Sequence, residues 1–221
     1  MKRANPHCSV AGCKTDKPHA DDPAIKAVII EFSDPEKMTS WVLHGMAELA
    51  YSICRDIAEN RVFAWHTRLR QPEELYVRTL YALFIADEKE LHHLLSGKRP
   101  NGLSVLYQKV NATVFEGRGV LQTIQAGLGI DSFTPMDTLN GGAHVSFPAF
   151  LTCIGLVKHP EFMPTDFQNK YTEHMNKYCT YLQYMNDLFK AGRTKEQVLA
   201  AVVSLHRPAS YWQEKAKTVT P

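Results

Sequence analysis

The sequence has no long apolar run and no dense set of cysteines. Its most apolar stretches, such as YALFIA (81–86) and FLTCIGLV (150–157), fall far short of the roughly 20 residues that a membrane-spanning helix needs. No apolar segment follows the basic start MKRAN, so no secretory signal is predicted. The five cysteines are odd in number and scattered, unlike the disulfide framework of a small secreted domain. These absences predict a cytoplasmic protein that has no membrane partner.

Alternation of apolar and polar residues, the pattern of a half-buried strand, is almost missing as well. KAVIIEF (26–32) is the only strand candidate. Glycines concentrate between 117 and 142, but neither G-x-x-x-x-G-K-[ST] nor a strand-flanked G-x-G-x-x-G is present. The sequence therefore predicts no phosphate-binding loop, and we interpret residues 117–146 as a glycine-rich connector between helices.

Helical periodicity, by contrast, covers most of residues 34–221. Asp34 is placed to cap a helix that has Pro35 in its first turn. Its expected apolar face is Met38, Val42, Gly45, Leu49 and Ile53. A second helix is expected to start at Gln71 and to run on to Leu95.

The clearest helix is predicted between Thr165 and Ala191, where apolar and aromatic residues recur every three or four positions. This seam consists of Phe167, Tyr171, His174, Tyr178, Leu182, Met185 and Phe189. Gly192 suits a left-handed C-cap, and Thr194 with Gln197 resembles a capping box. Of 221 residues, 44% are apolar, which suffices for one substantial domain. We predict an all-α, bundle-like domain over residues 34–221 behind a small irregular segment, residues 1–33.

That N-terminal segment contains NPHCSVAGCKTDKPHADDP, in which cysteine and histidine have metal-ligand character. Thiolates at Cys8 and Cys13 can reach one ion if the four residues between them turn tightly, with His19 as the third ligand. His7 is one option for the fourth, beside Asp21, Asp22 and Cys54. Because the segment has too few apolar residues to fold alone, a structural zinc ion would supply the missing free energy. Two reduced cysteines in a flexible arm, or a local disulfide, are the alternatives.

The six residues CSVAGC (8–13) resemble the opening of THAP-type zinc fingers, which also begin with a cysteine pair at this kind of spacing. The resemblance covers the knuckle alone. The family's later C-x2-H pair is missing, since Cys54 is followed by Arg55, Asp56 and Ile57. The similarity therefore implies shared turn chemistry and no family membership.

A second candidate site is the stretch RVFAWHTRLR, where basic and aromatic residues alternate. The net charge of +2 is too small to attract a polyanion by itself, so contact with nucleic acid would need such a local patch. Arg61, Arg68 and Arg70 would neutralise phosphates while Trp65 stacks on a base. The alternative interpretation is a basic helix end whose aromatic residues belong to the core.

Two carboxylate–histidine pairs have helical spacing that a metal site in a bundle would need. Glu90 and His93 are three residues apart, and His44 and Glu48 are four apart. Both pairs lie among charged neighbours, which favours ordinary side-chain pairing on an exposed helix face. Cys54, Cys153 and Cys179 lie in or beside apolar helical stretches, so they are expected in the core.

We therefore predict a non-catalytic binding or assembly subunit, an α-helical module with a structural zinc knuckle. Its expected partner is a protein, nucleic acid or both. The alternative function is a metal-dependent helical-bundle enzyme built on the two carboxylate–histidine pairs.

Overall fold

The computed structural model describes residues 23–69, 71–95, 103–117, 147–162 and 166–207. Every regular element in these ranges is a helix, which confirms the all-α prediction. The elements are α1 (Pro23–Phe32), α2 (Pro35–Ala58), α3 (Val62–His66), α4 (Gln71–Phe84), α5 (Glu88–Leu95), α6 (Leu103–Thr113), α9 (Phe147–Lys158), the 3-10 helix η1 (Pro160–Phe162), α10 (Phe167–Lys190) and α11 (Lys195–Leu205). None of the described helices is long and apolar enough to cross a membrane.

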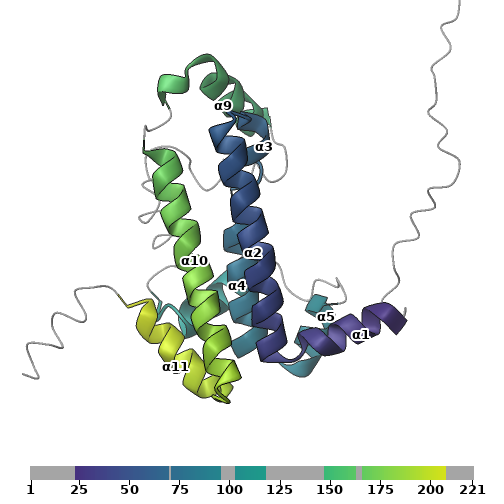
Figure 1. Ribbon diagram of the computed structural model, residues 1–221. Helices are drawn as coiled ribbons and strands as arrows, with labels where there is room; N and C mark the ends of the chain where they lie inside the picture. Colours follow the sequence, from purple (N-terminus) through teal and green to yellow (C-terminus); the bar gives the residue numbers. More distant parts are fainter. Residues whose placement is uncertain (1–22, 70, 96–102, 118–146, 163–165, 208–221) are drawn as a thin grey trace, which may run out of the picture.

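Two long helices, α2 and α10, lie side by side in opposite directions and form the centre of the bundle (Figure 1). The predicted cap of α2 is present, because the Asp34 carboxylate accepts hydrogen bonds from the backbone N–H groups of Glu36 and Lys37 at 2.9 and 3.2 Å. Met38, Val42 and Ile53 of the expected face are buried. Helix α4 lies behind α2 in Figure 1, and α11 packs across the lower end of α10.

The predicted aromatic seam is present on α10, and it packs inside the bundle. Phe167, Tyr171, His174, Tyr178, Leu182 and Met185 are all buried, and Phe189 is partly buried against the same core. The Tyr178 ring lies 4.7 Å from the Tyr76 ring on α4, measured between ring centroids. Burial of such large rings removes apolar surface from water and so stabilises the bundle.

A buried polar contact joins α2 to α10 near the lower end of the pair. Asn186 is only 2% exposed. In the amide orientation that satisfies both its ends, Asn186 Nδ2 donates to Thr39 Oγ1 and to the Glu36 carbonyl, while Oδ1 accepts from Lys190 Nζ. Displacing either helix along the other would leave these groups unpaired, so the contact fixes the register of α2 on α10.

The structure corrects the prediction for residues 26–32. This segment, KAVIIEF, was the only strand candidate, but it belongs to helix α1. Ile29 is buried where α1 packs on α2 and α5, whereas Ile30 is 72% exposed. The β-branched residues favour a strand by propensity, and packing of one helix face overrides that preference. Helix α1 thus lies within the segment predicted to be irregular.

The expected single helix from Gln71 to Leu95 is also divided. Helix α4 ends at Phe84, and α5 begins at Glu88. Asp87 lies between them and its carboxylate accepts a hydrogen bond from the Glu90 backbone N–H at 2.7 Å, as an N-terminal cap does. This helix start was not predicted, because the apolar spacing of α4 continues into α5.

The predicted end of α10 and start of α11 are confirmed. Gly192 has φ of 73°, in the left-handed region that favours glycine. The Thr194 hydroxyl accepts from the Gln197 N–H, and the Gln197 side chain accepts from the Thr194 N–H, which completes the capping box. The predicted connector beyond residue 117 lies outside the described residues.

Candidate functional site

The predicted zinc ligands Cys8, Cys13, His19 and His7 all lie outside the described residues, so the knuckle stays a prediction. In the part of the chain that the structure describes, no three His, Cys, Asp or Glu side chains gather as a metal site would need. Cys153 is buried in the core, as expected, and its burial raises the pKa of the thiol.

Arg68 of the basic–aromatic stretch is partly buried, with 27% of its side chain exposed, and is held by three partners. Its guanidinium pairs with the carboxylate of Asp56, which is only 5% exposed. Nη1 donates to Ser52 Oγ and Nε donates to the Ala64 carbonyl, each at 2.9 Å. Arg68 therefore compensates a buried charge and ties the end of α3 to α2.

The other described members of this stretch divide between the core and the surface. Trp65 is 2% exposed and packs against Phe167, with 5.5 Å between ring centroids. Arg61 is largely exposed and pairs with Glu59 at 2.6 Å, and Phe63 is 43% exposed. Arg70 lies outside the described residues. The core interpretation fits Trp65, whereas Arg61 and Phe63 lie at the surface.

The two carboxylate–histidine pairs are found in different settings. His44 Nε2 and Glu48 Oε1 lie 3.2 Å apart on the exposed side of α2. Glu90 instead accepts hydrogen bonds from Tyr81 Oη at 2.8 Å and from Lys109 Nζ at 3.3 Å. The hydrogen bond from Tyr81, helped by the Lys109 ammonium, keeps the pKa of Glu90 below its usual value. Glu90 thus links α5 to α4 and α6.

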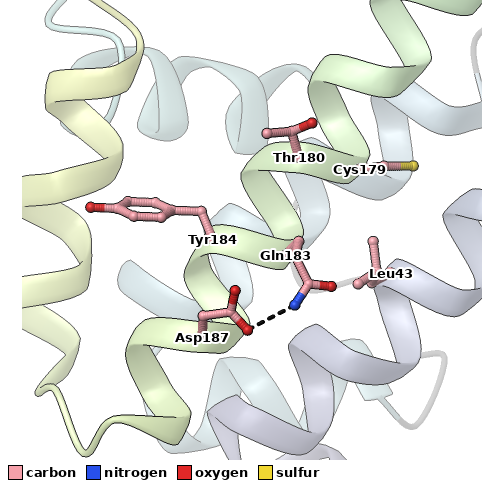
Figure 2. A pocket seen from close by; sticks show the side chains of 6 residues that line it. All are labelled: Leu43, Cys179, Thr180, Gln183, Tyr184 and Asp187. Atoms are coloured by element: carbon pink, nitrogen blue, oxygen red, sulfur yellow. Dashed lines mark hydrogen bonds between the residues drawn. The ribbon is translucent and has the colours of Figure 1, made fainter.

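An open depression lies between α2 and α10, with a volume of about 470 Å³. Figure 2 shows Leu43 on α2 and five side chains on α10, with a hydrogen bond of 2.7 Å from Gln183 to Asp187. Tyr184 extends away from Leu43, toward α11. Cys179 lines the depression, and burial raises the pKa of its thiol. A raised pKa disfavours the thiolate, which is the nucleophilic form of cysteine. The polar groups do not converge on a point, so the depression offers little to orient a small substrate.

A cluster of buried aromatic and histidine side chains connects α3 and α10. The side-chain polar atoms of Trp65, His66, Tyr171 and Tyr178, together with Nε2 of His174, have no hydrogen-bond partner among the described residues. Burial lowers the pKa of both histidines, that of His174 to about 4. Both imidazoles are therefore neutral near pH 7, as an apolar core requires.

The most conspicuous exposed feature is a row of four residues along α2: Trp41, His44, Glu48 and Tyr51, here called the α2 face. Trp41 is 53% exposed and Tyr51 is 71% exposed. Trp41 Nε1 donates to Glu31 Oε1 at 3.3 Å, and the Trp41 ring meets the His44 ring edge-on with centroids 6.4 Å apart. These contacts hold the indole in place at the surface.

Sequence reasoning missed the α2 face, although a signal for it exists. Its four residues are spaced by three or four, so they share one side of the helix. That side lies opposite the buried residues Met46 and Ile53. The α2 face was missed because the apolar spacing of α2 was interpreted only as the face that packs in the core.

Comparisons with protein-family models, with curated proteins and with solved structures gave no match to this chain. The described residues define a helical module whose most distinctive surface is the α2 face.

Proposed function

We propose that this chain is a non-catalytic binding or assembly subunit of the cytoplasm that docks a protein partner on the α2 face. The observation that carries the proposal is the exposure of Trp41 and Tyr51 on one side of a rigid helix. Tryptophan and tyrosine are enriched at the centres of protein interfaces because they bury a large area while few rotatable bonds become fixed. His44 and Glu48 lie between the two rings along the helix and add a hydrogen-bond donor and an acceptor.

The rigidity of the α2 face supports the same proposal. Helix α2 is fixed by its Asp34 cap, by the Asn186 contact and by long packing against α10. A surface that is already ordered loses little conformational entropy on binding. Partner recognition is therefore a better use of this face than support of the fold, to which its exposed rings contribute little.

The proposal is tested by the size of the chain in extracts of cells that are treated with a chemical crosslinker before lysis, so that weak complexes survive dilution. A tagged chain at its natural level is expected to elute well above the 25.0 kDa of the monomer. Replacing both Trp41 and Tyr51 by alanine is expected to shift elution toward the monomer, whereas Tyr184→Ala, which removes an exposed tyrosine from α10, leaves it unchanged. Elution of the wild-type chain as a monomer would contradict the proposal.

The zinc knuckle forms the second part of the proposed module, with Cys8, Cys13, His19 and His7 as ligands. The purified chain is expected to contain about one zinc ion, as a single four-ligand site requires. Changing Cys8 and Cys13 to serine together should remove the zinc while the helical circular dichroism is largely retained, because the described bundle has its own core. Elemental analysis measures this directly. Zinc retained by the double variant would favour the alternative, a metal-dependent enzyme that uses the helical pairs.

Contact with nucleic acid is a second candidate function, favoured by the exposure of Arg61 beside Phe63. Binding to a single-stranded oligonucleotide should weaken steeply as salt rises, because counterions are released from the phosphates. Arg61→Ala is expected to lower the affinity several-fold at low salt, with Arg78→Ala, at a partly exposed arginine of α4, as the control. Fluorescence anisotropy measures both variants. No binding at low salt would exclude this function.

A further inference from the structure

The α2 face is symmetric about the middle of the helix. Trp41 lies five residues before Met46 and Tyr51 lies five residues after it, while His44 and Glu48 lie two residues before and after. When two identical helices cross antiparallel about a two-fold axis, residues at equal distances from the axis face each other. With the axis at the level of Met46, Trp41 would face Tyr51 of the other copy, and His44 would face Glu48.

Both pairings are favourable. Indole and phenol rings pack well edge-to-face or offset, and each is already exposed on its own helix. In the single chain His44 Nε2 lies 3.2 Å from Glu48 Oε1, and in the dimer each imidazole would exchange this partner for the Glu48 carboxylate of the other copy. Because each copy supplies both members of each pair, the two-fold arrangement makes every contact twice.

From this self-complementarity the geometry points to a second copy of this chain as the partner that covers the α2 face. The inference rests on the proposed function, since it names the partner of the same surface. The interface would be isologous: two α2 helices, antiparallel, with the aromatic pairs at both ends and the histidine–carboxylate pairs between them.

The outer ends of the interface limit its strength. Lys37 and Arg55 would oppose each other across the axis, and like charges repel. The charge of Arg55 is offset by Glu59, 3.4 Å away, and Glu31 beside Trp41 adds a carboxylate at the Lys37 end. We expect one helix face per copy to bury less than the roughly 1,200 Å² at the lower limit of standard interfaces, so the dimer is expected to be weak, with a dissociation constant of about 10–100 µM.

Sedimentation of the full-length chain from about 5 µM to about 500 µM tests the inference, because this range spans the expected dissociation constant. The wild-type chain should pass from monomer to dimer as the concentration rises. Trp41→Ala should weaken dimerisation about tenfold or more, as loss of an interface tryptophan does. Tyr184→Ala should leave it unchanged. A chain that stays monomeric over the whole range would overturn the inference.

Charge exchange between two variants tests the antiparallel pairing itself. His44→Glu makes the centre of the face doubly acidic, and the double variant His44→Lys/Glu48→Lys makes it doubly basic. Each variant alone should remain monomeric, because the opposed groups then repel, while an equimolar mixture should form the mixed dimer. Both positions are exposed, so circular dichroism should show an unchanged fold. Dimers of either variant alone, as stable as the wild-type dimer, would overturn the inference.

The two proposals fail in distinguishable ways. A purified chain that is monomeric at every concentration, together with a large complex in cell extracts that requires Trp41 and Tyr51, would overturn the self-association and leave the proposed binding function standing. A monomer in both settings would contradict both proposals.

Discussion

Replacing Arg68 by alanine is expected to lower the free energy of unfolding by about 2–4 kcal/mol, because the substitution leaves the buried Asp56 carboxylate with only the more distant Arg61 as a counter-charge. Asp56 is 5% exposed and pairs with the Arg68 guanidinium, which also bonds to Ser52 and to the Ala64 carbonyl. Denaturant unfolding followed by circular dichroism measures the loss as a lower midpoint.

Arg61 provides the matched control for this prediction. It also contacts Asp56, but at 3.6 Å and from a largely exposed position, and it pairs more closely with Glu59. Arg61→Ala should therefore cost less than about 1 kcal/mol, as exposed ion pairs do. Equal destabilisation by the two substitutions would show that the Arg68–Asp56 pair does not have the role assigned to it.

The expected destabilisation by Arg68→Ala determines which arginine is suitable for a test of nucleic-acid binding. Loss of binding in an Arg68→Ala variant would be ambiguous, because the variant is expected to unfold more readily. Arg61→Ala removes an exposed arginine from the same stretch at little cost in stability. A test of the basic–aromatic surface therefore relies on Arg61.

The second large effect is a loss of stability in mild acid through His174. Burial keeps its pKa at about 4, with further lowering from Lys177 and an opposing effect of Glu173. An unfolded histidine titrates near 6.5, so between roughly pH 6.5 and 4 the unfolded chain takes up a proton that the native imidazole does not. The stability conferred by a neutral His174 is complete above that range and falls by about 3 kcal/mol as the pH drops through it.

His174→Leu should reduce this acid sensitivity, since it removes the titrating group and fills a similar space beside Tyr178. His66 is also buried with a lowered pKa, so part of the pH dependence should remain. The control is His44→Ala, which removes an exposed histidine. The measurement is the denaturant midpoint of unfolding of the wild-type chain and of each variant between pH 7 and pH 4. A slope unchanged by His174→Leu would contradict the account.

The fold was largely predictable where one chemical signal dominated. The aromatic spacing of α10, the Asp34 cap and the Thr194–Gln197 capping box each specify local geometry, and each is found as predicted. The strand candidate at residues 26–32 was wrong, because packing of one helix face overrides the strand propensity of these residues. The break before Glu88 was missed because apolar spacing continued through it.

The candidate surfaces were harder to predict, because exposure depends on tertiary packing. Trp65 and Phe63 are two residues apart in one short helix, yet one is buried and the other exposed. The partner of Arg68, Asp56, lies in a different helix and carries no local mark in the sequence. Trp41 and Tyr51 looked like ordinary members of an amphipathic helix until the buried side of α2 was known.

The central claim, that the α2 face contacts a protein, is tested most directly by a photo-crosslinking amino acid placed at position 51 in the full-length chain in cells. A covalent protein adduct is expected from position 51, lost when Trp41 is also changed to alanine, and absent when the same group is placed at position 184. Its mass should equal two copies of the chain if the partner is a second copy. No adduct at position 51, or an equal adduct at position 184, would contradict the claim.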